Sequence, residues 1–233
     1  MALIAGISAS ISSGIIGSYV VVKRIVFISG SISHSVLGGL GLAIYLRRVF
    51  DWEWLSPLYG AFFAAILSAW LIGWIRLYYR QREDTVIASL WAFGMSLGVI
   101  FISLTPGYNV ELTNYLFGNI LWVSPSDIFA LLLLGALLIV ITLCFYRKFL
   151  AICFDEDQAK LQTLHVKFLY FLLLSLVALT VVLLIQTVGA ILVIAILSLP
   201  AAIANTFTKN LRFMMLIAAV LGMIIAILGI FVV

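Results

Sequence analysis

The sequence predicts an all-α, polytopic integral membrane protein with about eight transmembrane helices. Of its 233 residues, 65% are hydrophobic and only 9% are charged, and the mean hydropathy is +1.29. A soluble domain carries about 25% charged residues, so one water-facing globule cannot hide this much apolar surface. The apolar residues also gather in runs of about 20, the length at which a helix crosses the hydrocarbon core of a bilayer.

Eight apolar runs reach this length. They cover residues 3–22, 27–46, 57–75, 86–104, 126–146, 168–185, 189–207 and 213–232. The stretch from Val166 to Ala204 is nearly continuous, and we divide it at Gln186 and Thr187, its most polar pair. We expect the spans to form a single transmembrane domain over residues 1–233.

The charged residues between the spans indicate the orientation. Lys23 and Arg24 follow the first run instead of preceding it, so that run is not a cleavable signal. With these two residues in the cytoplasm, 11 of the 13 Lys and Arg lie inside, and only Arg47 and Arg48 lie outside. Basic residues concentrate in cytoplasmic loops and Trp at the lipid headgroups. The basic excess therefore sets topology, with the N-terminus outside, and does not indicate a nucleic-acid partner.

His34 is the candidate metal contact. It lies inside the second span, and an ionisable residue there is a functional hypothesis by default. Gly30, His34 and Gly38 are spaced four apart, so they share one helix face. A neutral imidazole suits manganese, iron and zinc. The alternative is a buried neutral imidazole that makes a hydrogen bond between helices.

Four further positions are candidate pore or gate residues. Gly30 and Gly38 place small residues on the His34 face, where helix backbones can approach closely. Gln186 lies at the predicted break between the sixth and seventh spans. Pro200 removes an internal hydrogen bond and predicts a kink in the seventh span. Kinked helices rich in small residues occur at transporter gates and also as plain packing devices.

The most charged connection lies between the fifth and sixth spans. Its acidic residues come first, where a helix dipole favours them, and Glu156 and Lys160 can pair at i,i+4. We expect a short amphipathic helix over 155–164, either a solvated turn or a docking surface for a soluble partner. The candidate contact residues are Asp155, Glu156, Asp157, Lys160, Leu161 and Leu164.

Other segments exclude some functions. Residues 108–123 are apolar but too short to cross, which predicts an interfacial or re-entrant segment. The chain has no Gly-x-x-x-x-Gly-Lys-Ser/Thr motif, so we do not expect it to bind ATP at a P-loop. Cys144 and Cys153 lack metal or redox spacing, and we expect both to be reduced.

Three sets of segments together resemble the permeases of metal-type ABC importers. The first runs from Gly17-Ser-Tyr-Val-Val-Val-Lys-Arg to Ser33-His34 and Gly38-Gly39. The second is Leu112-Thr-Asn-Tyr-Leu-Phe-Gly-Asn-Ile-Leu with Ser124-Pro-Ser-Asp. The third is Phe154-Asp-Glu, then Gln186-Thr-Val-Gly and Leu199-Pro-Ala-Ala. Their order and spacing fit nearly the whole chain.

The resemblance implies a homodimeric permease with the fold of the cobalamin and siderophore permeases. It implies two cytoplasmic ATP-binding subunits, an extracytoplasmic metal-binding protein and a divalent metal ion as substrate, with no permanently bound cofactor. Residues 155–164 fall where such permeases place the helix that couples to the ATPase. His34 matches the Ser-His of the motif in the metal path, but Gly30 stands where many members carry an acidic residue. Family members also extend further at both ends.

The leading hypothesis is thus the membrane subunit of an ATP-driven importer of manganese, iron or zinc. It is a transport subunit of the inner or plasma membrane, and ATP is hydrolysed by its partner. An alternative is a stand-alone secondary transporter driven by an ion gradient, which would need buried acidic residues that are scarce here. A third is a membrane assembly subunit that does not transport.

Overall fold

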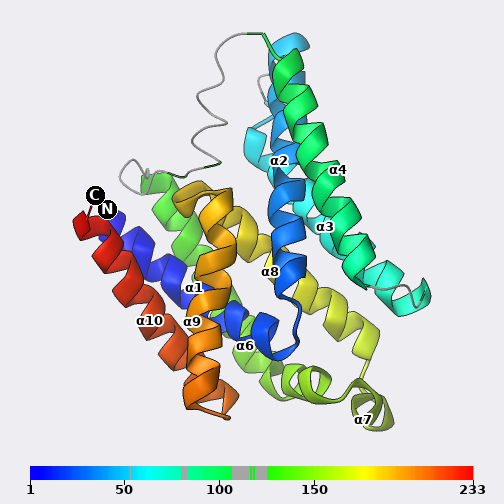
Figure 1. Cartoon of the computed structure of the whole chain (residues 1–233), viewed down its shortest axis with the longest axis vertical. Helices are drawn as coiled ribbons and strands as arrows, with labels where there is room; N and C mark the ends of the chain where they lie inside the picture. The colour runs from blue at the N-terminus through cyan, green and yellow to red at the C-terminus, as the bar shows by residue number, and fades with distance from the viewer. Residues whose placement is uncertain (53, 80–82, 107–115, 117, 119–124, 233) are drawn as a thin grey trace.

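The fold is a bundle of helices, seen here in a computed structural model that describes residues 1–233 except 53, 80–82, 107–115, 117, 119–124 and 233. The helices, labelled in Figure 1, are α1 (Ala2–Val22), α2 (Val26–Val49), α3 (Pro57–Tyr79), α4 (Glu83–Leu104), α6 (Pro125–Phe154), α7 (Glu156–Leu161), α8 (Val166–Val188), α9 (Ala190–Phe207) and α10 (Leu211–Val232). Eight of them are long and apolar enough to cross a membrane. This confirms the predicted all-α, eight-span class.

Several helices run three or more residues beyond the predicted spans, and two of these differences have a clear cause. The fifth span was expected to end at residue 146, but α6 runs on to Phe154 and so carries Arg147 and Lys148 within the helix. The sixth and seventh spans separate at Gly189, three residues beyond Gln186, and Gly189 has φ of 88°. Only glycine adopts such a conformation readily, so it ends α8 and begins α9. The predicted re-entrant segment at 108–123 lies outside the described residues apart from Leu116 and Gly118.

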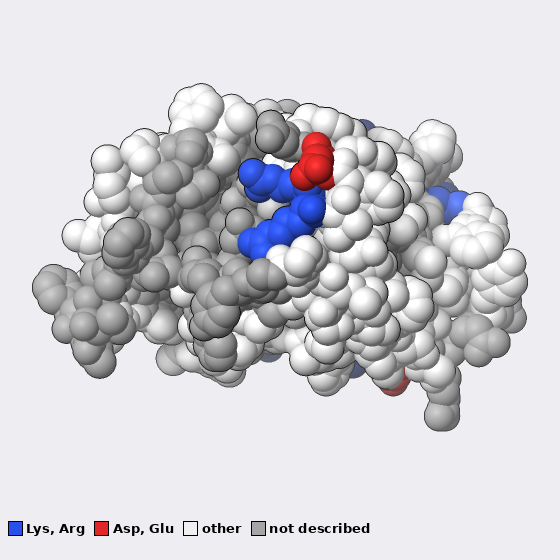
Figure 2. All heavy atoms as spheres, turned by 90° about the horizontal axis from the view of Figure 1, so that it is seen from above, with Lys and Arg blue, Asp and Glu red and all other residues white. Residues whose placement is uncertain are grey.

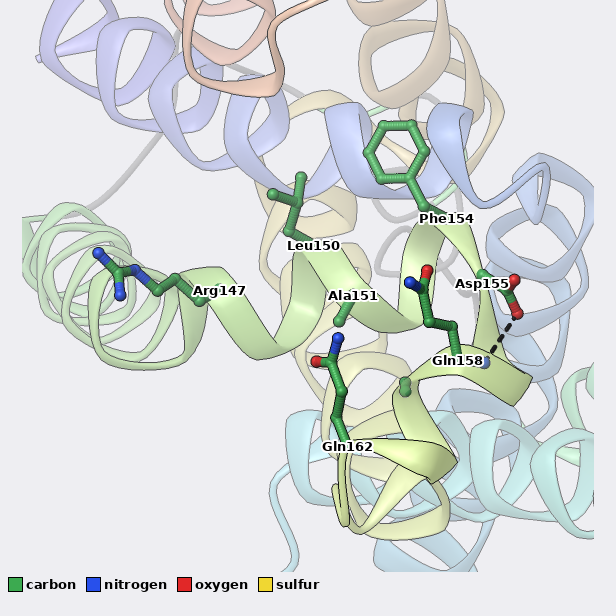
Figure 3. A pocket seen from close by; sticks show the side chains of 8 residues that line it. Arg147, Leu150, Ala151, Phe154, Asp155, Gln158 and Gln162 are labelled. Atoms are coloured by element: carbon green, nitrogen blue, oxygen red, sulfur yellow. Dashed lines mark hydrogen bonds between the residues drawn. The ribbon is translucent and has the colours of Figure 1, made fainter.

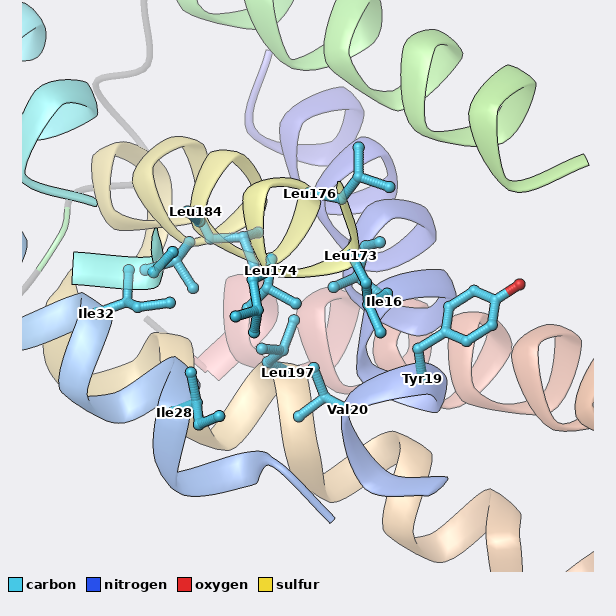
Figure 4. Packing of buried hydrophobic residues seen from close by; sticks show 14 of the residues in the cluster. Ile16, Tyr19, Val20, Ile28, Ile32, Leu173, Leu174, Leu176, Leu184 and Leu197 are labelled. Atoms are coloured by element: carbon cyan, nitrogen blue, oxygen red, sulfur yellow. The ribbon is translucent and has the colours of Figure 1, made fainter. Parts of the chain in front are cut away.

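The bundle has two groups of helices joined by α8. Helices α2, α3 and α4 pack together, and α1 packs with α6, α9 and α10, while α8 contacts members of both groups (Figure 1). Helices α1, α2 and α8 are also the most enclosed. Their buried side chains meet around α8 (Figure 4) and include Ile16, Val20, Ile28, Ile32, Leu173, Leu174 and Leu197 of α9. Helices α1, α2 and α8 thus form the centre of the bundle.

Charges divide between the two ends of the bundle. The end at the top of Figure 1 holds the last turns of α2 and α4, and Arg48 donates there to the carbonyl of Pro106. Figure 2 views this end, where charged side chains are sparse among the described residues. At the opposite end, contacts bring together basic residues from distant connections, such as Lys23 and Arg76. This arrangement agrees with the predicted positive-inside topology.

Candidate functional site

His34 lies on α2 and is covered by an aromatic ring from α4. Its imidazole stacks on the indole of Trp91, with 4.5 Å between ring centroids and 21° between planes. Nδ1 of His34 is buried, and the part of the chain that the structure describes supplies no hydrogen-bond partner for it. The alternative of an interhelical hydrogen bond through Nδ1 is therefore not observed among these residues.

Gly30, one turn earlier, faces the same indole. A Cβ at this position would lie 2.8 Å from Cζ3 of Trp91 and 3.2 Å from Cδ1 of Ile194. Such contacts are shorter than packed carbon atoms allow, so an acidic side chain fits here only if Trp91 moves. Sequence analysis missed Trp91, and its one signal was a Trp well inside a span, away from the interface where Trp is usually found.

Hydroxyl groups just before His34 hold α2 against two neighbouring helices. Ser31 Oγ donates to the carbonyl of Ile87 in α4 (3.1 Å), and Ser33 Oγ donates to the carbonyl of Ala190 at the start of α9 (3.2 Å). Within the described residues, no group of three or more His, Cys, Asp or Glu could hold a metal ion. The role of His34 as a metal contact therefore stays a prediction.

Gly38 marks a close crossing of α2 and α4. A Cβ on Gly38 would lie 2.8 Å from the carbonyl oxygen of Gly94, and a Cβ on Gly94 would lie 2.5 Å from Cα of Ser35. Small residues allow this backbone approach between membrane helices. The structure thus supports a packing role for Gly38 and adds Gly94, which sequence analysis missed.

Gln186 and Pro200 lie elsewhere in the bundle. Gln186 is partly buried in the last turn of α8. Pro200 is buried in α9, which continues through it to Phe207. Gly17 of α1 packs against α9 beside it, so closely that a Cβ would overlap the carbonyl of Leu197. The gate roles of Gln186 and Pro200 stay predictions.

Helix α7 is the predicted short amphipathic helix, reduced to Glu156–Leu161. Asp155 caps it, because its carboxylate accepts from the backbone N–H of Asp157 (2.9 Å) and Gln158 (3.1 Å). Such caps satisfy the unpaired N–H groups of a first turn. Asp155, Asp157, Gln158, Lys160 and Leu161 are all exposed. They form a surface open to a partner.

The predicted pairing within α7 is wrong. Lys160 Nζ pairs with Asp157 (2.7 Å), and Glu156 turns inward to Lys23 (2.5 Å) and Arg76 (3.1 Å). Leu161 is 85% exposed, whereas Leu164 packs against the core. The two leucines therefore do not form one apolar face, since the helix ends between them and the chain turns at Thr163 with φ of 57°.

The exposed ion pair between Lys160 and Asp157 shifts the pKa of both residues. The hydrogen bond from Lys160, and then its charge, lower the pKa of Asp157 below the usual value. The same contact raises the pKa of Lys160. Both groups are solvated, so the pair adds little stability and serves mainly to order the surface of α7.

A hollow of about 250 Å³ lies between α7 and the end of α6. Arg147, Leu150 and Phe154 line it from α6, while Gln158 and Gln162 extend toward α6 from the other side (Figure 3). Phe154 is 70% exposed. A basic group, amides and apolar carbons thus meet beside the exposed surface of α7.

Eight helices of the described chain are long and apolar enough to cross a membrane, and they define a multi-pass membrane protein. The chain belongs to the ABC 3 transport family, whose model matches residues 1–233. A probable metal transport system membrane protein from Chlamydia pneumoniae is 45% identical over 227 residues, covering 97% of this chain and 77% of that protein.

Two further matches agree. The manganese transport system membrane protein MntC of Halalkalibacterium halodurans is 34% identical, over 99% of this chain and 76% of its own length. A chain in the structure of PsaBC from Streptococcus pneumoniae in complex with Fab has a TM-score of 0.85 and 31% identity, covering 99% of this chain and 80% of that one. The family resemblance and the fold class are therefore confirmed.

Proposed function

We propose that this chain is the membrane subunit of an ATP-driven importer of a divalent metal ion, with manganese ahead of iron and zinc. The observation that carries the proposal is family membership along the whole chain together with relatives named for metal and manganese transport. ATP-driven transport is favoured over the secondary transporter, because the family is one of ABC transport proteins.

The partners are a pair of cytoplasmic ATP-binding subunits and an extracytoplasmic metal-binding protein, and the permease works as a homodimer. Several features of the chain support this assignment. The exposed surface of α7 and the hollow beside it lie at the end of the bundle rich in basic residues. His34 on α2 supplies the imidazole that a passing cation meets, and Trp91 covers it in this conformation.

The experiment is reconstitution of the chain with its ATPase in proteoliposomes, with the metal-binding protein supplied outside. Uptake of manganese, iron and zinc is measured with ATP and with a non-hydrolysable analogue. We expect ATP-dependent manganese uptake that excess iron or zinc suppresses less well than excess manganese. An ATPase that neither co-purifies with the chain nor drives uptake of any of the three metals would overturn the proposal.

A further inference from the structure

We propose that Lys23, Glu156 and Arg76 form a charged clamp that carries movement of α7 to α1 and α3 during transport. Glu156 is then a positioning residue and not a contact for the ATPase. This inference rests on the proposed function, because it concerns how α7 passes the motion of an ATP-driven partner to the spanning helices.

One carboxylate oxygen joins three elements that are far apart in the sequence. Oε1 of Glu156, in the first turn of α7, lies 2.5 Å from Nζ of Lys23 and 3.1 Å from Nη2 of Arg76. Lys23 caps the C-terminal end of α1, and Arg76 lies in the last turn of α3. A displacement of Glu156 therefore acts on both helices at once.

The clamp is shielded from solvent, unlike the other ion pair of α7. The side chain of Lys23 is 7% exposed, that of Arg76 21% and that of Glu156 26%. In the Lys160–Asp157 pair the corresponding values are 61% and 88%. Coulomb attraction grows as water is excluded, so the inner contacts are the stiffer link, while water and salt weaken the outer pair.

Two more contacts extend the clamp to α6 and α8. Nζ of Lys23 also donates to the carbonyl of Ile152 near the end of α6. The guanidinium of Arg76 lies 4.5 Å from the centre of the Tyr170 ring in α8. The cytoplasmic ends of four spanning helices thus meet around one acidic side chain.

Helix α7 directly follows α6, with only Asp155 between them, and Ala159 is its one buried side chain. Its main packing contacts are with α6 and α8, so the clamp is what joins it to α1 and α3. Because α3 packs along α2, the clamp also gives α7 a route to the helix that carries His34.

The test compares uptake with ATP hydrolysis in reconstituted complexes. Glu156→Gln and Lys23→Met remove one charge each. Asp84→Asn and Lys209→Met are matched controls, because both residues are exposed and lie outside α7 and the clamp. Three quantities are measured for each complex: ATPase bound per permease, ATP hydrolysed, and manganese taken up per ATP.

We expect Glu156→Gln and Lys23→Met to retain bound ATPase and hydrolysis but to lose at least about fivefold in manganese per ATP, the lower end of coupling between sites. Lys23→Arg, which keeps the charge, should restore most of that ratio, and the controls should match the native chain. If removal of either charge misfolds the chain, the double variant Lys23→Met with Glu156→Gln removes the most buried charge of the clamp together with its partner, and only the more exposed Arg76 stays charged. It should fold and show the same uncoupling.

Two results would overturn the clamp while leaving the proposed function intact. One is an unchanged manganese-to-ATP ratio in the single variants, or in the double variant where the singles misfold. The other is loss of bound ATPase in proportion to uptake, which would make Glu156 a docking residue. A native complex without ATP-dependent uptake would instead remove the proposed function itself, so the two failures are distinguishable.

Discussion

At the scale of single residues, the stack of His34 on Trp91 brings the candidate metal contact under an aromatic cover. The ring lies against both His34 and the space beside Gly30. If His34 contacts the metal as proposed, a cation must displace the indole or approach past its edge to reach the imidazole. Trp91 fills the space beside Gly30, the position at which the family resemblance implies an acidic side chain in many members.

The first prediction concerns His34. His34→Ala should lower manganese uptake by about tenfold or more, the effect of losing a contact of about 1.4 kcal/mol, while leaving expression and bound ATPase unchanged. His165→Ala is the matched control, because His165 is exposed and its side chain makes no capping hydrogen bond. Equal uptake by the two variants would assign His34 to packing.

The second prediction concerns Gly94, where α4 crosses α2. Gly94→Ala places a methyl group 2.5 Å from the backbone of Ser35, and overpacking of this kind costs about 1–3 kcal/mol. The variant should unfold at a lower temperature than the native chain in detergent. Gly229→Ala is the control, because nothing lies within 4 Å of a Cβ there. If the unfolding temperature of Gly94→Ala were as high as that of the control, α2 and α4 would accommodate the added methyl group without loss of stability, and the prediction would be wrong.

At the scale of elements, α7 owes its first turn to Asp155. Asp155→Ala removes both capping hydrogen bonds, to Asp157 and Gln158, at a cost of about 1 kcal/mol. The amides of these two residues should then exchange with deuterium about fivefold faster. His165→Ala again serves as a control, and unchanged exchange in Asp155→Ala would show that the helix forms without its cap.

The Lys160–Asp157 pair gives α7 a pH dependence. The folded-state pKa of Asp157 is lowered, so the stability it contributes is present above its unfolded pKa and is lost as pH falls through its folded pKa. The folded-state pKa of Lys160 is raised, so the stability it contributes is lost as pH rises through its folded pKa. Protection of the α7 amides should therefore be greatest between these limits and fall at both extremes. Asp157→Asn should flatten the acid side of this profile, and an equally steep acid limb in that variant would exclude the pair as its cause.

At the scale of the whole molecule, hydropathy predicted the eight spans because crossing a bilayer needs only length and apolar composition. It could not predict the end of α6, since Arg147 and Lys148 interrupt the apolar run whereas the helix continues through them to Phe154. Local spacing favoured an ion pair between Glu156 and Lys160, because the i,i+4 rule applies only to neighbours on one helix. The actual partners, Lys23 and Arg76, come from other helices and become neighbours only on folding.

The candidate site around His34 was likewise predicted only in part. His34, Gly30 and Gly38 were predicted to share a face because their spacing is a property of one helix. Trp91 and Gly94 reach that face from α4. The residue spacing within either span does not reveal which helices pack against each other. The sequence thus identified the α2 face, and the structure identified what covers it.

In the proposed function, ATP hydrolysis by a partner drives metal through this chain. The decisive experiment measures accumulation of manganese against its gradient by the reconstituted native complex, in the presence of ionophores that abolish proton and sodium gradients. We expect accumulation that requires ATP and persists with the ionophores. Accumulation that the ionophores abolish while ATP remains would contradict it, because an ion gradient would then be the driving force.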